Sequence, residues 1–257
     1  MDYLKNNLLH CSTCHQPKET IIRVLGKTKK VNCLCACEKK DRDGYYLKVK
    51  EAQHNRRIQD LRLNGFSDKK LRRWTFENDN LKNPRLTKIA KNFVKNFREF
   101  SKNGKGLLFA GRVGSGKTYM SACIANALIS QGVPVLMTSF PDIANRYSED
   151  FDERAKFIRG LKNYSLVIFD DLGVERKSDY MNEIVTNVID TCYRSGISMV
   201  ISTNLTSEEM FADLNRERIY SRILEVCSPI TVDGENERNQ LSIYNYNRTR
   251  QILGGKK

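Results

Sequence analysis

The stretch LLFAGRVGSGKTYMS, residues 107–121, joins a short apolar segment to a helix-forming segment through a glycine-rich turn. Gly111 is followed, after four residues, by Gly116, Lys117 and Thr118. This is the Walker A spacing of a phosphate-binding loop. The three glycines of the turn permit backbone conformations in which successive N–H groups point at one phosphate, at the N-terminus of the next helix. The stretch therefore predicts a nucleotide site.

The residue types in this loop suit a nucleoside triphosphate and a divalent cation. The Lys117 ammonium is placed to reach the β and γ phosphates of ATP, and the Thr118 hydroxyl to bind Mg²⁺. The residues expected to contact the nucleotide are Gly111, Val113, Gly114, Ser115, Gly116, Lys117, Thr118 and Tyr119. The alternative is a surface turn with an exposed lysine. It is disfavoured because the motif stands between a predicted strand and a predicted helix.

Apolar segments that alternate with helix-like segments make up most of the chain after residue 80. Strands are predicted at 106–110, 133–139, 165–169 and 198–202. Alternating strands and helices form a parallel sheet covered by helices. The predicted fold class is therefore α/β, with a P-loop NTPase core in which helices flank a parallel sheet.

Two of the predicted strands end in polar residues that suit the other half of a nucleotide site. The third strand, in SLVIFDDLG, ends in Asp170 and Asp171, which indicates a Walker B motif. Asp170 is expected to hold Mg²⁺ through water, and Asp171 to orient the attacking water. Asn204 follows the fourth strand, where ligands bind in this architecture, and can hydrogen-bond the γ-phosphate. The alternative for these polar residues is simple capping of the next loop or helix.

The amino-terminal cysteines are spaced like zinc ligands. Cys11 and Cys14 form a CxxC pair, and Cys33, Cys35 and Cys37 follow at alternate positions. Alternate residues on a strand face one side, so Cys35 and Cys37 are expected to complete a tetrahedral Zn²⁺ site, with Cys33 able to replace either. Disulfides are disfavoured in a reducing compartment, and a thioredoxin-like redox pair lacks its surrounding βαβ pattern.

Length and composition set the domain organisation. The 257 residues allow one sizeable core and a small appendage. We expect a zinc-binding module at 1–40, a charged connecting helix at 41–65 and the ATPase domain at 66–257. No run approaches the roughly 18 apolar residues of a membrane span, and the amino terminus is polar, so no secretory signal is expected either. These features predict a cytoplasmic protein.

The chain is basic, with 44 Lys and Arg against 30 Asp and Glu and a formal net charge of +14. This excess indicates a polyanionic partner, unless the lysines merely solvate helices. Two segments interleave rings with cations, as single-strand binding does. The residues expected to contact DNA are Arg146 and Tyr147 in one segment, and Lys177, Ser178 and Tyr180 after the two aspartates. For the first segment, the alternative is an amphipathic helix pair with its rings in the core.

Five segments together, GRVGSGKT, LVIFDDLG, ISTNL, ERIYSRIL and VDGENER, resemble the DnaC, DnaI and IstB branch of the AAA+ ATPases over residues 80–240. The cysteine cluster resembles the zinc-binding head of DnaI-type and phage loaders. The roles that the resemblance implies are nucleotide and Mg²⁺ contacts for Lys117 and Thr118, Walker B for Asp170 and Asp171, sensor 1 for Asn204, arginine finger for Arg222 with Arg218 as second choice, and sensor 2 for Arg238.

The resemblance implies an ATP-dependent helicase loader that grips a replicative hexameric DNA helicase through its zinc region, self-associates through AAA+ interfaces and binds single-stranded DNA. Many AAA+ proteins have glutamate where Asp171 stands, so slow, switch-like hydrolysis is expected. One alternative is a transposition helper of the IstB type, which acts with a transposase on duplex DNA. Others are a nucleoside kinase, which would need an acceptor pocket, and a non-catalytic adaptor that binds ATP only structurally.

Overall fold

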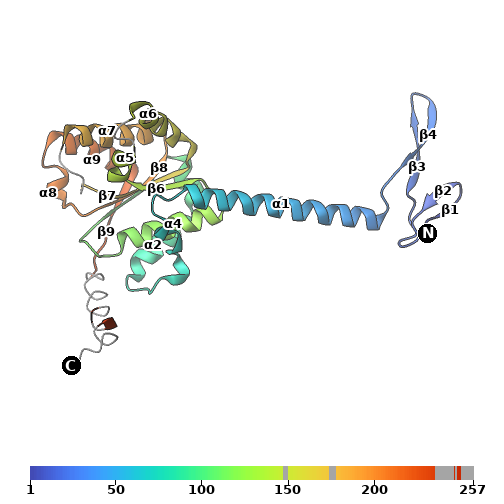
Figure 1. Cartoon of the computed structure of the whole chain (residues 1–257), viewed down its shortest axis with the longest axis horizontal. Helices are drawn as coiled ribbons and strands as arrows, with labels where there is room; N and C mark the ends of the chain where they lie inside the picture. Colours follow the sequence, from blue (N-terminus) through green and yellow to red (C-terminus); the bar gives the residue numbers. More distant parts are fainter. Residues whose placement is uncertain (147–149, 174–177, 235–245, 247, 250–257) are drawn as a thin grey trace. The chain divides into compact units, whose positions relative to one another are not determined.

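The computed structural model describes residues 1–146, 150–173, 178–234, 246 and 248–249. The chain divides into two compact units, Met1–Arg57 and Ile58–Lys257 (Figure 1). Among the described residues, no helix combines the length and the apolar character needed to cross a membrane.

The first unit is built from two short antiparallel hairpins. Its strands are β1 (Tyr3–Lys5) paired with β2 (Leu8–His10), and β3 (Glu19–Val24) paired with β4 (Lys27–Asn32). Both hairpins turn through two residues with positive φ, Asn6 and Asn7 in the first and Leu25 and Gly26 in the second. Turns of this hand match the twist of the flanking strands.

Helix α1 (Ala36–Asn64) follows the second hairpin. It begins directly after Cys35, whose backbone N–H donates to the Glu38 carboxylate at 3.1 Å. This contact is the returning half of a capping box and fixes the start of the helix. The prediction that Cys35 and Cys37 lie on a strand is therefore wrong, because Cys37 is in the first turn of α1. No residue of α1 is buried.

The second unit is organised around one five-stranded sheet, and every neighbouring pair in it is parallel. The strand order is β6-β7-β8-β5-β9. The bounds are β5 Gly106–Ala110, β6 Val135–Ser139, β7 Leu166–Leu172, β8 Ser198–Thr203 and β9 Cys227–Thr231. The first four confirm the predicted strands. The fifth, β9, was not predicted, since it is short, contains Pro229 and lies at the sheet edge, where proline is tolerated.

Helices cover both faces of this sheet (Figure 1). Alternate strand residues point to opposite faces, so Val167 and Phe169 enter one apolar cluster while Leu166 and Ile168 enter the other. The first cluster includes residues of α5 (Phe140–Arg146), α7 (Asp179–Arg194) and α9 (Leu214–Val226). The second includes residues of α2 (Pro84–Lys95) and α4 (Lys117–Ser130). The predicted α/β architecture is confirmed.

Shorter helices complete the second unit: η1 Lys69–Arg73, η2 Phe76–Asn78, α3 Phe97–Lys102, α6 Phe151–Gly160, η3 Leu161–Asn163 and α8 Ser207–Met210.

The segment before α2 packs against one of the apolar clusters. Phe66 is buried, and Trp74 and Phe76 pack against the same apolar cluster as α4. Ile58 and Leu61 of α1 also contact that cluster. The carboxyl ends of β5, β7 and β8 lie at one edge of the sheet, where the site is found.

Candidate functional site

The phosphate loop connects β5 to α4 at the carboxyl edge of the sheet. Gly114 and Gly116 adopt positive φ of 82° and 93°, a region that glycine enters without steric cost. Gly116 is the N-cap of α4, which begins at Lys117. A Cβ at Gly111 would lie 2.2 Å from the carbonyl oxygen of Val232. Only glycine therefore permits this approach between the loop and the segment after β9.

Lys117 connects the loop to the neighbouring strand. Its side chain is buried, and its ammonium donates hydrogen bonds to the carbonyl oxygens of Gly111 and Arg112 at 2.8 and 2.9 Å. It also donates to the Asn204 side-chain oxygen at 2.7 Å. The structure thus brings together the two residues that the sequence assigned to the phosphate loop and to sensor 1.

The two aspartates lie on the strand beside β8. Asp171 has an unusual φ of 54°, and its carboxylate accepts a hydrogen bond from the Asn204 amide at 3.4 Å. Asp170 accepts from the Ser202 hydroxyl at 2.6 Å. Burial raises the pKa of Asp170 above its ordinary value, against the effect of the Ser202 hydrogen bond. Lys117, Asn204 and Asp171 therefore form one hydrogen-bonded chain across the sheet edge.

A cavity of about 380 Å³ opens beside this chain, within the size range of small-ligand sites. Its lining residues from the predicted set are Val113, Gly114, Ser115, Gly116, Lys117, Thr118, Tyr119, Asp171 and Asn204. The Ser115 hydroxyl is buried there without a hydrogen-bond partner among the described residues. An unpartnered buried hydroxyl, a lysine and two glycines with positive φ at the start of α4 fit a bound phosphate chain.

The sequence analysis missed one wall of this cavity. That wall comes from the segment before α2 and from the first turn of α2. Its lining residues are Trp74, Asn78, Asp79, Asn80, Asn83 and Leu86. The Tyr119 hydroxyl donates to the Thr75 carbonyl at 2.9 Å and its ring lies 5.7 Å from the ring of Trp74, which ties the segment to α4. The run of Asn and Asp residues was the available signal, but it also suits an ordinary linker.

The predicted finger arginine makes its contacts within the same chain. The Arg222 guanidinium lies 2.9 Å from the Asp190 carboxylate of α7 and 3.2 Å from the Arg218 carbonyl oxygen. Arg218, the second choice, is exposed on α9. Arg238 lies outside the described residues.

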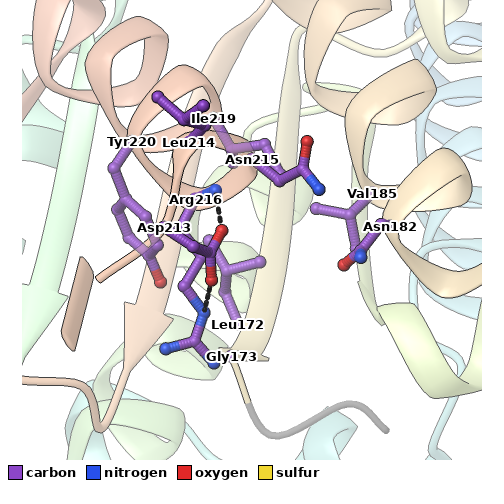
Figure 2. A pocket seen from close by; sticks show the side chains of 10 residues that line it. All are labelled: Leu172, Gly173, Asn182, Val185, Asp213, Leu214, Asn215, Arg216, Ile219 and Tyr220. Atoms are coloured by element: carbon purple, nitrogen blue, oxygen red, sulfur yellow. Dashed lines mark hydrogen bonds and ion pairs between the residues drawn. The ribbon is translucent and has the colours of Figure 1, made fainter. Parts of the chain in front are cut away.

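The larger cavity of the second unit, about 600 Å³, is a different place (Figure 2). It lies between the end of β7, α7 and the start of α9, and none of its lining residues belongs to the phosphate loop. Asp213 caps α9 there by accepting from the Arg216 backbone N–H at 2.9 Å. Asn182 and Val185 form the opposite wall in Figure 2.

The first unit contains a separate candidate metal centre. Cys11, Cys14, Cys35 and Cys37 place their sulfur atoms within 4.8 Å of one another. Hydrogen bonding from the Cys37 backbone N–H lowers the pKa of the Cys14 thiol to about 6, which favours a thiolate at Cys14. The hydrogen bond with Cys35 raises the pKa of the Cys37 thiol to about 12, since neighbouring sulfurs disfavour a second thiolate until a cation binds. Four sulfur donors at this spacing fit tetrahedral Zn²⁺. Cys33 lies outside the group and points its thiol at the Pro17 carbonyl at 3.5 Å.

The predicted DNA contacts are only partly described. Arg146 ends α5 and is exposed, and Tyr180 is exposed in the first turn of α7. Ser178 caps α7 by accepting from the Met181 N–H at 3.2 Å. Tyr147 and Lys177 lie outside the described residues.

Tyr180 belongs to a cluster that joins α6 to α7. The Arg154 guanidinium lies 4.3 Å from the ring centroid of Phe151 and 5.2 Å from that of Tyr180. Arg154 is buried, whereas the two rings are exposed. Tyr180 therefore takes part in a cation–ring contact between two helices.

A family model described as IstB-like ATP binding protein matches residues 28–243, most of the chain. The chain belongs to this family. Among its relatives, the replicative helicase loader DnaI of Bacillus subtilis (strain 168) is 26% identical over 161 residues, which are 57% of this chain and 51% of that protein. The replicative helicase loader DnaC of Escherichia coli (strain K12) is 30% identical over 129 residues, 49% of this chain and 52% of that protein. The chain thus spans about half the length of these relatives.

Solved structures show the same fold. The crystal structure of the DnaC helicase loader superimposes with a TM-score of 0.53 and 29% identity, over 60% of this chain and 92% of that chain. The DnaI structure gives a TM-score of 0.56 over 65% and 94%, and at 21% identity it shows the fold alone. Family and fold confirm the prediction of an ATP-binding protein with the fold of the DnaC helicase loader.

Proposed function

We propose that the protein is an ATP-dependent loader of a replicative hexameric DNA helicase and that it acts on single-stranded DNA. The observation that carries the proposal is the hydrogen-bonded chain from Lys117 through Asn204 to Asp171. It joins the phosphate loop to the carboxylate that would orient the attacking water in this proposal. The relatives named as replicative helicase loaders support the choice of partner.

The residues at the sheet edge have separate tasks in this proposal. Lys117 would hold the β and γ phosphates, and Thr118 and Asp170 would hold Mg²⁺, which when bound neutralises phosphate charge. Asp171 would orient the attacking water, and Asn204 would hydrogen-bond near the γ-phosphate. The Asp171 side chain is one methylene shorter than glutamate, so hydrolysis would be slow and ATP would act as a switch.

Self-association would complete the site with an arginine from a neighbouring copy. Arg222 is the proposed finger, since a cation beside the γ-phosphate stabilises transition-state charge. Its ion pair with Asp190 at 2.9 Å would have to open before Arg222 reaches a neighbour. Arg218 is exposed on the same helix and is the alternative finger.

The first unit, which contains the four cysteines of the candidate metal centre, is the part of the protein proposed to bind the helicase. Cys11, Cys14, Cys35 and Cys37 would hold Zn²⁺, and bound zinc would supply folding free energy that the small unit lacks. The unit lacks a helix with paired histidines, as DNA-reading fingers of that class have, so contact with a protein is the proposed role.

Single-stranded DNA would bind over the exposed rings of α6 and α7 and the cation at the end of α5. Tyr180 and Phe151 offer exposed faces for base stacking, while Arg146 offers a cation for phosphate. Tyr147, Lys177 and Ser178 complete the proposed set. Tyr180 lies on α7, the helix that follows β7. A change at Asp171 when nucleotide binds would therefore alter the position of the DNA-binding residues on α7.

A transposition helper is the second candidate, and the match to the IstB-like family model favours it. Such a protein would use the same nucleotide site. It would differ in its partner, a transposase, and in its preference for duplex DNA.

The test is recovery of the partner followed by reconstitution. Tagged protein is expected to retain a hexameric helicase from its source cell and, with ATP, to raise the amount of that purified helicase on circular single-stranded DNA. Lys117→Ala should lose this loading, whereas Lys102→Ala, an exposed lysine on α3, should keep it. Recovery of a transposase and stimulation by duplex DNA, with no helicase bound, would contradict the loader proposal.

A further inference from the structure

The pairing of β7 with β8 is irregular at the two aspartates. Phe169 pairs with Ile201 and Leu172 pairs with Thr203. Asp170 and Asp171 therefore lie opposite a single residue, Ser202. Two residues against one define a β-bulge, which redirects a side chain and is frequent beside active sites.

The bulge has a conformational cost at Asp171. Its φ of 54° is in the left-handed region, which residues other than glycine rarely enter. In a regular strand, two successive side chains would point to opposite faces. The bulge instead lets the Asp171 side chain line the nucleotide cavity and contact Asn204. Something must hold this conformation, because strained backbone persists only where its surroundings determine it.

Ser202 makes hydrogen bonds to both residues of the bulge. Its hydroxyl oxygen accepts the Asp171 backbone N–H at 2.8 Å. Its hydroxyl hydrogen is donated to the Asp170 carboxylate at 2.6 Å. An N–H can only donate and an ionised carboxylate can only accept, so with Asp170 ionised the Ser202 hydroxyl accepts from Asp171 and donates to Asp170. The Ser202 side chain is fully buried, and water cannot easily replace it.

We propose that Ser202 is a positioning residue for nucleotide hydrolysis, which orients the Asp170 carboxylate and locks Asp171 in the conformation that turns its carboxylate into the cavity. The inference rests on the proposed ATPase function. Ser202 reaches the site only through the two aspartates. Strand pairing uses backbone groups and does not need a hydroxyl at position 202. Alanine could also occupy this buried position, so burial does not account for a serine here.

The strand provides a matched control. Ser198, at the start of β8, is equally buried, and its hydroxyl has no hydrogen-bond partner among the described residues. Ser198→Ala and Ser202→Ala remove the same atom from the same strand. They differ in whether that atom contacts the aspartates.

The first measurement needs no nucleotide. Amide hydrogen exchange at Asp171 in the full-length protein is expected to quicken by about tenfold or more in Ser202→Ala, since its acceptor is lost. Ser198→Ala should leave this rate as in the wild type. Equal exchange at Asp171 in both variants would overturn the proposed lock.

The second measurement separates turnover from binding. Ser202→Ala is expected to lower kcat by about tenfold or more, because hydrogen bonds to charged groups are among the stronger ones. Its affinity for ATP without Mg²⁺ should stay within about twofold, since the phosphate loop is intact. A kcat for Ser202→Ala equal to that of Ser198→Ala would overturn the positioning role of Ser202. So would a fall in kcat that is accompanied by a similar fold-loss of ATP affinity and by a lower melting temperature, because it would indicate general destabilisation.

The outcomes also separate this inference from the proposed function. If the wild-type protein shows no ATP turnover that depends on Lys117, the ATPase proposal fails, and with it the catalytic meaning of Ser202. If turnover depends on Lys117 but not on Ser202, only the positioning role fails.

Discussion

The first unit, Met1–Arg57, which the structure describes in full, buries only Cys11 and Cys35 among its apolar side chains, whereas the second unit buries two large apolar clusters on the two faces of its sheet. Both buried residues of the first unit belong to the candidate metal centre. A unit without an apolar core needs another source of folding free energy. We therefore infer that bound metal would stabilise the first unit, whereas apolar burial stabilises the second.

The largest expected effect follows from this difference. Cys11→Ser should abolish zinc binding and unfold the first unit, because structural zinc supplies about 10 kcal/mol or more to small domains. ATP affinity should not change, since the apolar clusters of the second unit are untouched. Metal analysis should find one zinc per chain in the wild type and none in the variant, and limited proteolysis should cut only the first unit.

Cys33→Ser is the control for this prediction. Its thiol lies outside the four-sulfur group, so zinc content and protease resistance should match the wild type. Wild-type protein that is prepared without chelator and holds no zinc would refute the proposed basis of the comparison.

The second prediction concerns a change that should inactivate the second unit and leave the first unit folded. Lys117→Ala should abolish ATP turnover, because it removes a cation that faces two phosphates in a partly desolvated site. Zinc content should stay at one per chain. Turnover and binding by the purified variant are measured against Lys102→Ala. Asp171→Asn is the contrasting change, expected to retain ATP without hydrolysing it. ATP affinity and turnover like those of the wild type in Lys117→Ala would refute the site assignment.

The third prediction asks whether the second unit is complete by itself. Arg222→Ala should lower turnover by about 1,000-fold or more if Arg222 acts on a neighbour's nucleotide. Mixing it with Lys117→Ala protein should restore activity to about a quarter of the wild-type value, since random assembly makes one interface in four intact. Asp190→Asn removes the negative charge that lies 2.9 Å from Arg222 but keeps the arginine itself. This variant should retain turnover. Activity of Arg222→Ala like that of the wild type, with no effect of mixing, would instead point to Arg218.

The sequence was most informative where function depends on neighbouring residues. The phosphate loop and the CxxC pair were predictable because a few residues at fixed spacing set their geometry. Ser202 was not, because its importance depends on a register shift between two strands that are far apart in the chain. The placement of Cys37 was also missed, since the start of α1 depends on the contact from Cys35 to Glu38. The wall of the cavity around Trp74 arises from tertiary packing of a linker.

The smallest expected effect tests whether the second unit carries the DNA contact. Tyr180→Ala should weaken binding of single-stranded DNA by ATP-bound protein about tenfold, since base stacking contributes about 1–3 kcal/mol. The dependence of affinity on salt should not change, because no cation is removed, whereas Arg146→Ala should flatten it. Phe211→Ala, another exposed aromatic of the second unit, should bind as the wild type does. Zinc content and ATP affinity should stay constant in all three variants. If single-stranded and duplex DNA bind equally, and neither nucleotide nor Tyr180→Ala matters, the positive charge of the chain serves solvation and the transposition-helper function gains support.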